Sequence, residues 1–312
     1  MAIIKLLPSC KETIWGGTKL KTRFNKVYGG DTLGETWELS CHRDGESVVS
    51  GGPQAGMPLS GYIREYGAQV LGTNCRHFEM FPVLIKLIDT KQDLSIQVHP
   101  DDGYALEKEG QYGKTELWYV VDCEEGAAIY YGFCREVTKE EVRRLIAEGR
   151  LTEALGRVLV KPGDVFFIPA GTIHAIGAGI TIAEIQQNSN LTYRVYDYGR
   201  KGADGQPRKL HVEEALEVAL LEPPKQAAPS GGHLGLCRYF QVDLLQSGNQ
   251  YSGYAAEDTF HHLLILEGTG AIANAGEHIP FQKGDSIFLP AGSGAYRLEG
   301  ACSCLLTTIP EA

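Results

Sequence analysis

The sequence predicts a mainly β protein made of two related β-barrel modules, the first of which is enlarged by helices. Short apolar stretches that alternate with polar residues, as strands do, recur along most of the chain. The segment GDVFFIPAG at 163–171 returns as GDSIFLPAG at 284–292, an offset of 284 − 163 = 121 residues. In both copies Gly-Asp forms a hairpin turn, the apolar residues form a short barrel strand, and Pro-Ala-Gly turns the chain into the next strand.

A helical insertion explains the larger size of the first module. The strand at 116–121 has its counterpart at 262–267, an offset of 262 − 116 = 146 residues, which exceeds the motif offset by 146 − 121 = 25. This surplus is about the size of a predicted helical insert near 134–156. Thr138, followed three residues later by Glu141, is a capping-box signature that begins a helix there.

The boundaries of the modules follow from composition. Residues 222–235 are rich in Pro, Gly and Ala, and they are predicted to form a linker. The linker separates an N-terminal module at 1–221 from a C-terminal module at 236–312.

The other elements follow from local periodicity and turn residues. Strands are expected over 35–40, 81–89, 95–99, 116–121, 127–132, 157–160, 165–168 and 180–187. Helices are expected near 60–71, from Pro100 to Glu109, and over 211–221, before Pro223-Pro224. Beyond the linker only short strand patterns occur, from Tyr239 to Thr308.

Composition restricts the classes of function. The chain of 312 residues carries a net charge of −10, which disfavours general binding to nucleic acid or to a membrane surface. None of its eight cysteines forms a C-x-x-C pair, so we expect reduced thiols in a cytoplasmic protein. No signal peptide or membrane span is expected. Among the possible partners, this leaves a small molecule as the expected one. We expect the protein to be a monomer or a homodimer.

Polar residues of the first module form a candidate metal site. Gln97 and His99 are two residues apart on a predicted strand, so both side chains point to the same face, into the barrel. His99, Glu116 and His174 supply two imidazoles and a carboxylate, the ligand set of a divalent metal that keeps an open coordination position. In the second module the position of His174 is taken by Ala295 (174 + 121 = 295). We therefore expect one metal site, in the first module.

These residues lie in segments that resemble a known family. The segments are LSIQVHPDD at 94–102, KTE at 114–116, PAGTIHA at 169–175, IWGG at 14–17, GETWE at 34–38 and NLTYR at 190–194. They resemble a type I mannose-6-phosphate isomerase (phosphomannose isomerase), in the short bacterial form, within the cupin superfamily. The resemblance covers nearly the whole chain. It implies two cupin, jelly-roll-like barrels and a metal-dependent aldose–ketose isomerase that interconverts mannose 6-phosphate and fructose 6-phosphate through an enediolate.

The resemblance also implies roles for single residues. It makes His99, Glu116 and His174 the ligands of one Zn²⁺ per chain, with Gln97 as a fourth ligand. Longer relatives carry a His-Lys pair before the metal-binding glutamate, whereas this chain has Gly113-Lys114. The histidine of that pair, which has a proposed role in opening the sugar ring in those relatives, is therefore missing here. Either another group opens the ring, or the spontaneous opening of the substrate suffices.

The catalytic residues implied by the resemblance are Arg194, Lys114 and Glu184. Arg194 is a candidate for binding the phosphate or stabilising the enediolate, and a structural ion pair with Asp197 is the alternative. Lys114 and Glu184 are both candidates for the base, and the sequence does not choose between them. The alternative for Lys114 is that it is a solvated loop residue. The alternative for Glu184 is that it only satisfies a hydrogen bond within the barrel. Lys86, within an apolar strand, either reaches the phosphate or extends towards solvent.

Two rival functions remain open at this stage. Two histidines and a carboxylate also form the facial triad of non-haem iron oxygenases. A regulator that binds sugar phosphates without turning them over would keep the barrels as well, because barrels of this kind host many functions.

Overall fold

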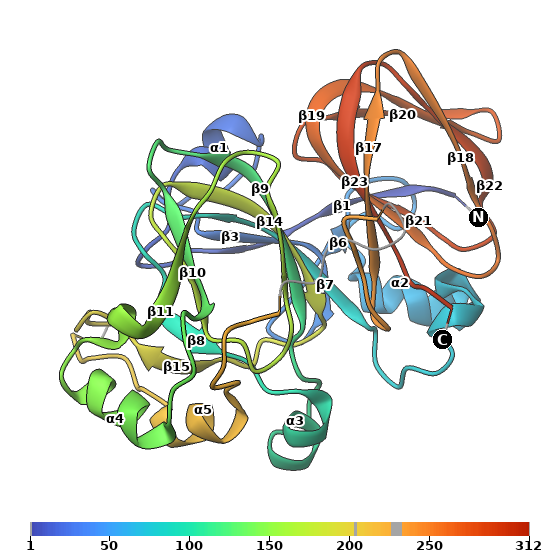
Figure 1. The fold of residues 1–312 in the computed structure, drawn as a ribbon. Coiled ribbons are helices and arrows are strands. Elements are labelled where there is room, and N and C mark those ends of the chain that lie inside the picture. The colour runs from blue at the N-terminus through green and yellow to red at the C-terminus, as the bar shows by residue number, and fades with distance from the viewer. Residues whose placement is uncertain (1, 203–204, 226–232, 312) are drawn as a thin grey trace.

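The structure is a computed structural model that describes residues 2–202, 205–225 and 233–311. Two β-rich lobes lie side by side, and strands from the two halves of the chain dominate one lobe each (Figure 1). The predicted mainly β class is confirmed. Within the described residues, no helix is long and apolar enough to cross a membrane.

The first lobe consists of two antiparallel sheets packed face to face. The first sheet has the order β12-β9-β14-β7-β3-β2 and the second the order β11-β10-β13-β8-β15. The first contains β2 (Ser9–Lys11), β3 (Glu35–Leu39), β7 (Val83–Asp89), β9 (Glu116–Cys123), β12 (Val165–Ile168) and β14 (Ile180–Gln187). The second contains β8 (Ile96–Val98), β10 (Ala128–Phe133), β11 (Leu155–Leu159), β13 (His174–Ile176) and β15 (Tyr193–Tyr196). Trp118 and Ile129, from different sheets, share one buried cluster, so the core lies between the sheets.

Strands β7 and β14 are buried along their whole length because both of their faces are covered. Ile88 and Ile182 join the core between the two sheets. Ile85 and Ile185 join a second cluster that includes Phe288 of the other lobe. The nearly continuous apolar run at 83–88 follows from this position, since a strand covered on both faces needs no polar side.

The second lobe is one branched ten-stranded sheet. Its main path has the order β16-β17-β23-β19-β21-β1-β6, and β18, β20 and β22 branch from it. The strands are β1 (Ile4–Leu7), β6 (Val48–Val49), β16 (Gly235–Leu236), β17 (Gln241–Ser247), β18 (Gln250–Ala255), β19 (His261–Asn274), β20 (Glu277–Gln282), β21 (Ser286–Leu289), β22 (Gly294–Glu299) and β23 (Cys302–Thr308). The division into modules at 1–221 and 236–312 stays a prediction. In this sheet, the N-terminal strands β1 and β6 lie among the C-terminal strands, because β1 pairs with β21 and with β6. Of the predicted linker 222–235, residues 226–232 lie outside the described residues.

Short helices and turns lie around the sheets of both lobes. They are α1 (Lys19–Arg23), α2 (Leu59–Tyr66), α3 (Asp102–Lys108), α4 (Lys139–Ala147) and α5 (Val212–Val218), with 3-10 turns η1 (Ala68–Leu71), η2 (Thr73–Cys75) and η3 (Leu151–Ala154); β4 (Cys41–His42) and β5 (Gly45–Glu46) form a small hairpin. Thr138 caps α4 by accepting a hydrogen bond from the Glu141 amide, as the capping box predicts. Residues of α4 and α5 pack with Ile96 and Tyr193 of the five-stranded sheet. Helices α3, α4 and α5 all lie at the lower end of this lobe in Figure 1.

Strand pairing corrects one residue of the internal repeat. The 146-residue offset makes His262 the counterpart of Glu116. In the structure Glu116 lies opposite Ile168, and His261 lies opposite Leu289. Because 289 − 168 = 121 equals the motif offset, His261 is the true counterpart. No motif fixed the register across the insert, and a slip of one residue reverses the face to which a strand residue points.

Candidate metal centre and cavity

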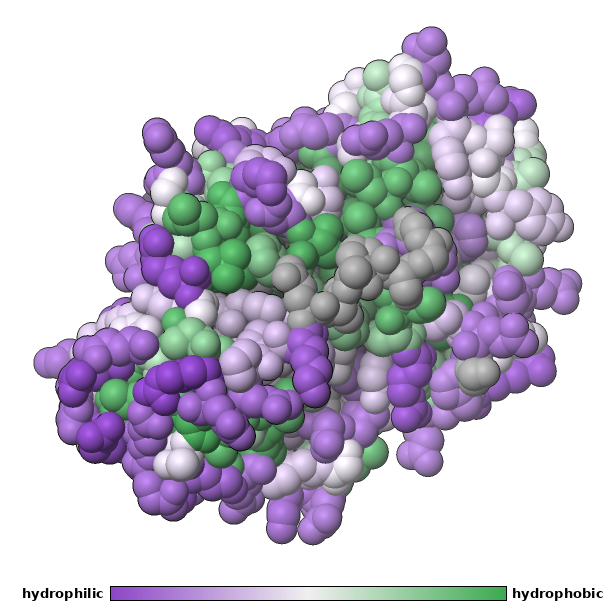
Figure 2. All heavy atoms as spheres, in the orientation of Figure 1, coloured by the Kyte–Doolittle hydropathy of each residue, from purple (hydrophilic) through white to green (hydrophobic). Residues whose placement is uncertain are grey.

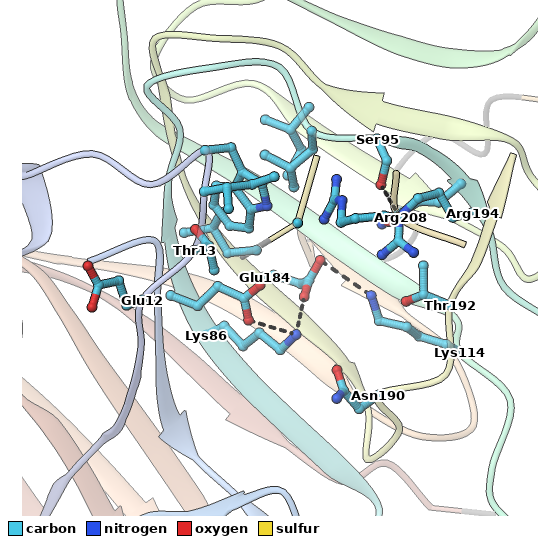
Figure 3. Close-up of a pocket in the computed structure, with 18 of the residues that line it drawn as sticks. Glu12, Thr13, Lys86, Ser95, Lys114, Glu184, Asn190, Thr192, Arg194 and Arg208 are labelled. Carbon is cyan, nitrogen blue, oxygen red and sulfur yellow. Dashed lines mark hydrogen bonds and ion pairs between the residues drawn. The ribbon is translucent and has the colours of Figure 1, made fainter. Parts of the chain in front are cut away.

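A cavity of about 570 Å³ lies beside strands β7, β8, β14 and β15. Charged and polar side chains dominate its wall, which suits a polar ligand. Figure 3 shows Lys86 and Glu184 near the middle of the cavity, with Arg194 and Arg208 together at one end beside Ser95.

The structure brings the three predicted metal ligands together. His99 follows β8, Glu116 begins β9 and His174 begins β13. All three side chains are buried, and one potential ligand atom from each lies within 4.8 Å of the others. The Glu116 carboxylate is 3.1 Å from His174 Nε2 and 3.8 Å from His99 Nε2. The three residues therefore converge on one point, the two histidines from adjacent strands of the five-stranded sheet and Glu116 from the facing six-stranded sheet.

Backbone carbonyls fix how both imidazoles present their nitrogens. The Nδ1 atom of His99 is 2.8 Å from the Leu191 carbonyl, and that of His174 is 2.9 Å from the Thr172 carbonyl. A carbonyl only accepts, so each Nδ1 carries the proton and each Nε2 offers its lone pair to the centre. Burial, and then the charge of Lys114, lower the pKa of His174 to about 4 and the pKa of His99 well below its usual value. Both rings are thus neutral at pH 7, as metal ligands must be.

Gln97 lies at the same centre. It is the direct neighbour of His174 across the β8–β13 pairing, and its terminal amide nitrogen is 3.4 Å from His174 Nε2. A turn of the amide about its last bond would bring the oxygen to the same place. The position fits the predicted fourth ligand, whose role stays a prediction.

The donor set fits a divalent cation. Both carboxylate oxygens of Glu116 are fully buried, and each faces the Nε2 atom of one of the two imidazoles. The Lys114 ammonium group lies 2.5 Å from Glu116 Oε2 and 3.2 Å from His99 Nε2. A positive charge thus already lies beside the ligand atoms. Buried carboxylate and imidazole groups that converge in this way are typical of a metal site.

Alternating charges extend from this centre along the cavity. Glu184 lies 3.7 Å from Lys114 and 3.4 Å from Lys86, and Lys86 lies 3.4 Å from Glu35. The Trp118 indole N–H donates a 3.0 Å hydrogen bond to Glu184. Lys114 is buried, so the alternative of a solvated loop lysine is wrong. Lys86 is buried as well and pairs with carboxylates instead of extending into solvent.

The two buried carboxylates differ in their tendency to ionise. Burial raises the pKa of Glu116, and Lys114 only partly opposes that effect. Burial also acts against ionisation of Glu184, but Lys114 and Lys86 outweigh it, so the pKa of Glu184 lies below its usual value. Glu184 is therefore an ionised carboxylate in a water-poor site.

Arg194 lies one strand away from the metal centre. It is the direct neighbour of Gln97 across the β8–β15 pairing, and its side chain lines the cavity. Its Nε donates to Ser95 at 3.3 Å, and its NH1 donates to the Lys209 carbonyl at 3.1 Å. Asp197 pairs instead with Arg200 and Arg208, so the structural pair considered from the sequence is not formed among the described residues.

Gly113 is closely packed, which excludes a side chain at this position. A Cβ atom there would lie 2.4 Å from the backbone carbon of Asp101 and 2.6 Å from the Pro100 carbonyl oxygen. The Gly113 amide donates to Asp102, which holds the two segments together. The histidine expected from longer relatives would therefore need a different path for residues 100–102.

Sequence reasoning missed several residues of the cavity wall, among them Arg208, His211, Thr192 and Glu35. Arg208 stands in a loop without a recognisable motif. The sequence offered one clue to Arg208. Asp197 stands in a segment rich in arginine, and its carboxylate needs a cationic partner because it is buried.

The second lobe has no such centre among the residues that the structure describes. The counterparts of Glu116 and His174 are His261 and Ala295, and the His261 ring lies 3.0 Å from the hydroxyl of Tyr296.

Comparison with known proteins shows the family. Residues 3–125 match the model of the phosphomannose isomerase type I catalytic domain, and residues 233–309 match that of the mannose-6-phosphate isomerase cupin domain. The chain is 40% identical over 313 residues to mannose-6-phosphate isomerase ManA of Bacillus subtilis, with 96% of each covered. It is 39% identical to mannose-6-phosphate isomerase of Streptococcus mutans, with 92% of each covered.

Solved structures agree. The crystal structure of mannose 6-phosphate isomerase from Bacillus subtilis aligns with a TM-score of 0.90 at 36% identity, covering 98% of this chain and 99% of that one. A putative mannosephosphate isomerase from Archaeoglobus fulgidus aligns with a TM-score of 0.81 at 21% identity, covering 99% of this chain and 98% of that one, which supports the fold alone. The predicted mainly β, cupin-family fold is confirmed by the first match and by the cupin family model, and jelly-roll-like barrels are compatible with it. The chain belongs to the type I mannose-6-phosphate isomerase family.

Proposed function

We propose that this protein is a metal-dependent isomerase that interconverts mannose 6-phosphate and fructose 6-phosphate. The observation that carries the proposal is the convergence of two neutral, carbonyl-oriented imidazoles on the buried Glu116 carboxylate. This centre adjoins a cavity whose wall carries paired lysine and glutamate side chains and, at one end, two arginines. Family membership supplies the substrate class.

Each step of the chemistry has a candidate group. Aldose–ketose isomerisation moves a proton between C1 and C2 through an enediolate. His99, Glu116, His174 and Gln97 would hold a divalent cation, which supplies stabilisation of the negative charge that develops on the sugar oxygens. The neutral rings keep their lone pairs directed to that cation at pH 7.

We assign the proton transfer to Glu184. It is ionised and lines the cavity, and its Oε2 lies 3.4 Å from the Lys86 ammonium group. Lys114 is less suited to act as a base because Glu116 and Glu184 both hold its ammonium group. We propose that Lys114 stays charged and stabilises the carboxylates around it.

Metal analysis combined with an activity assay tests the proposal. Purified protein is analysed for metals and assayed for conversion of mannose 6-phosphate to fructose 6-phosphate, before and after chelation. Near-stoichiometric metal and activity that chelation abolishes and metal restores are expected. Bound iron with oxygen-dependent turnover would instead support the oxygenase. Bound sugar phosphate without turnover would support the regulator.

We further infer zinc as the metal, a monomer or homodimer, and the cytoplasm as the compartment. Two histidines, a carboxylate and an amide suit zinc, a borderline ion that favours nitrogen and oxygen donors at sites with an open position. All eight cysteines are free thiols, which fits a reducing compartment.

A further inference from the structure

A hydroxyl group of the second lobe bonds to helix α3 of the first lobe. Tyr239 lies in the turn between β16 and β17, and its hydroxyl donates a 2.5 Å hydrogen bond to Asp102 Oδ2. The tyrosine ring packs near Phe78, with 6.1 Å between the ring centroids. The bond joins residues 137 positions apart in the chain, so it forms only when the two lobes are in contact.

Apolar packing holds this turn against the first lobe. Phe240 shares one buried cluster with Leu117 of strand β9, and its ring lies 6.3 Å from that of Phe167. Hydrophobic residues lie along the junction of the lobes on the face drawn in Figure 2. Leu117 directly follows Glu116, so the turn lies beside the strand that carries a predicted metal ligand.

Asp102 accepts hydrogen bonds from three different segments. Besides the Tyr239 hydroxyl on Oδ2, its Oδ1 accepts from the Gly113 amide at 2.9 Å and from the Gln187 side chain at 2.7 Å. Donors on both oxygens fix the orientation of a carboxylate, and bonds to a charged acceptor are strong. Helix α3, the loop before β9, the end of β14 and the second lobe therefore meet at this one side chain.

Three consecutive backbone amides of the loop before β9, at 113–115, are held from outside the loop. The first donates to Asp102, the second to the Pro100 carbonyl at 3.0 Å, and the third to the Gln187 side chain at 2.8 Å. A backbone fixed at three consecutive residues also fixes the direction of the middle side chain. That side chain is Lys114, whose ammonium group lies at the metal centre.

We propose that Tyr239 and Asp102 are positioning residues, through which the second lobe holds the loop at 113–115 and thereby the Lys114 ammonium group. Neither residue lines the cavity, so both act through Lys114 and not by touching the substrate. The second lobe, which has no metal centre of its own among the described residues, thus contributes to the site in the first. The effect on turnover rests on the proposed isomerase function, whereas the hold on the loop does not.

Tyr239→Phe tests the inference, with Tyr254→Phe as the matched control. The first variant removes the hydroxyl that holds Asp102 and keeps the ring, and the second removes the hydroxyl of an exposed tyrosine of the same lobe. In Tyr239→Phe we expect kcat for mannose 6-phosphate to fall about tenfold, because a displaced group in the site slows the reaction, and KM to stay within about twofold. Tyr254→Phe should behave like the wild type, and thermal unfolding verifies that both variants are folded during the assay.

A double-mutant cycle tests whether Tyr239 acts through Lys114. In the Lys114→Met background, Tyr239→Phe should lower kcat no further, because the group that the tyrosine positions is gone. An equal loss of kcat in both backgrounds would overturn the inference, since it would show a structural effect that does not depend on Lys114. An unchanged kcat in the single variant Tyr239→Phe would overturn it as well.

Hydrogen exchange separates this inference from the proposed function, because it needs no turnover. Amide exchange in a peptide that contains residues 113–115 is followed by mass spectrometry. We expect it to become several-fold faster in Tyr239→Phe and in Asp102→Ala, and to stay unchanged in Tyr254→Phe, because loss of a tie favours local opening. Faster exchange in a protein that shows no isomerisation would keep the hold on the loop and reject the isomerase. Unchanged exchange in Tyr239→Phe would reject the hold, even where the isomerase stands.

Discussion

At the scale of single residues, the metal centre depends on which nitrogen of each imidazole carries the proton. The carbonyl groups of Leu191 and Thr172 determine this because each can only accept a hydrogen bond. The sequence predicted His99, Glu116 and His174, since their spacing places them on strands of one barrel. It did not show the two carbonyls, because any residue type can supply a backbone oxygen.

The first prediction concerns His174. In His174→Ala we expect metal and isomerase activity to be lost together, because one of the two imidazole ligands disappears from a buried centre. His261→Gln is the matched control, because His261 is a half-buried histidine of strand β19 in the second lobe with no metal-ligand cluster around it among the described residues. Metal analysis and the coupled assay measure both variants. Full metal content and turnover in His174→Ala would disprove the ligand assignment.

The second prediction separates metal binding from proton transfer. Glu184→Gln keeps an oxygen that can accept from the Trp118 indole but loses the basic carboxylate. We expect metal content within a factor of two of the wild type and a fall in kcat of at least about a hundredfold, as for loss of a general base. Exchange of the C2 proton of the substrate with deuterated water, followed by NMR, should slow in parallel. Normal exchange would assign the base to another residue.

At the scale of elements, strand β3 connects the cavity with the contact between the lobes. Its residue Glu35 pairs with Lys86 at the cavity wall, and Glu38 pairs with Lys26 on the other side. Alternation of side chains along a strand explains both contacts. The strand itself was predicted from this alternation. The lysine partners of its two glutamates were not predicted, because Lys26 lies between α1 and β3 and Lys86 lies on β7, and only folding brings these segments together.

The third prediction concerns the close contact of Gly113 with the segment at 100–102. Gly113→Ala would place a Cβ atom 2.4 Å from the backbone carbon of Asp101, so the segments must separate. We expect the protein to lose roughly 1–3 kcal/mol of stability, as overpacked sites do. Gly103→Ala in helix α3 is the control, since its Cβ would meet only the Asp101 side chain, at 3.4 Å. Thermal unfolding measures both, and equal midpoints would contradict the prediction.

At the scale of the whole molecule, polar groups are buried where the two lobes meet. Lys26 pairs with Glu38 at 2.7 Å, Ser286 donates to the Glu38 carbonyl at 2.8 Å, and His262 Nε2 lies 2.8 Å from the Ser286 hydroxyl. The sequence predicted two modules from the repeat. It could not predict that β1 joins the second lobe, because a strand of four residues carries no signal for a partner about 280 residues away, at Phe288.

The last prediction concerns the effect of His262 on how the stability of the protein depends on pH. Burial, reinforced by Lys26, lowers the pKa of His262 to about 3, against a usual value of 6.5. Between these values the unfolded chain binds a proton at this residue and the folded chain does not. The free energy of unfolding therefore falls as the pH falls below 6.5, by about 2 kcal/mol at pH 5.

His262→Gln removes this titration and keeps a side chain that can bond to Ser286. Unfolding is measured at pH 7 and pH 5 in chelator, so that release of metal does not contribute. His99 and His174 titrate in the same direction, but they are present in both proteins and cancel in the comparison. We expect the variant to lose about 2 kcal/mol less stability than the wild type between the two pH values. His278→Gln, at an exposed histidine, should match the wild type, and an equal loss in His262→Gln would show that His262 becomes protonated within the folded protein.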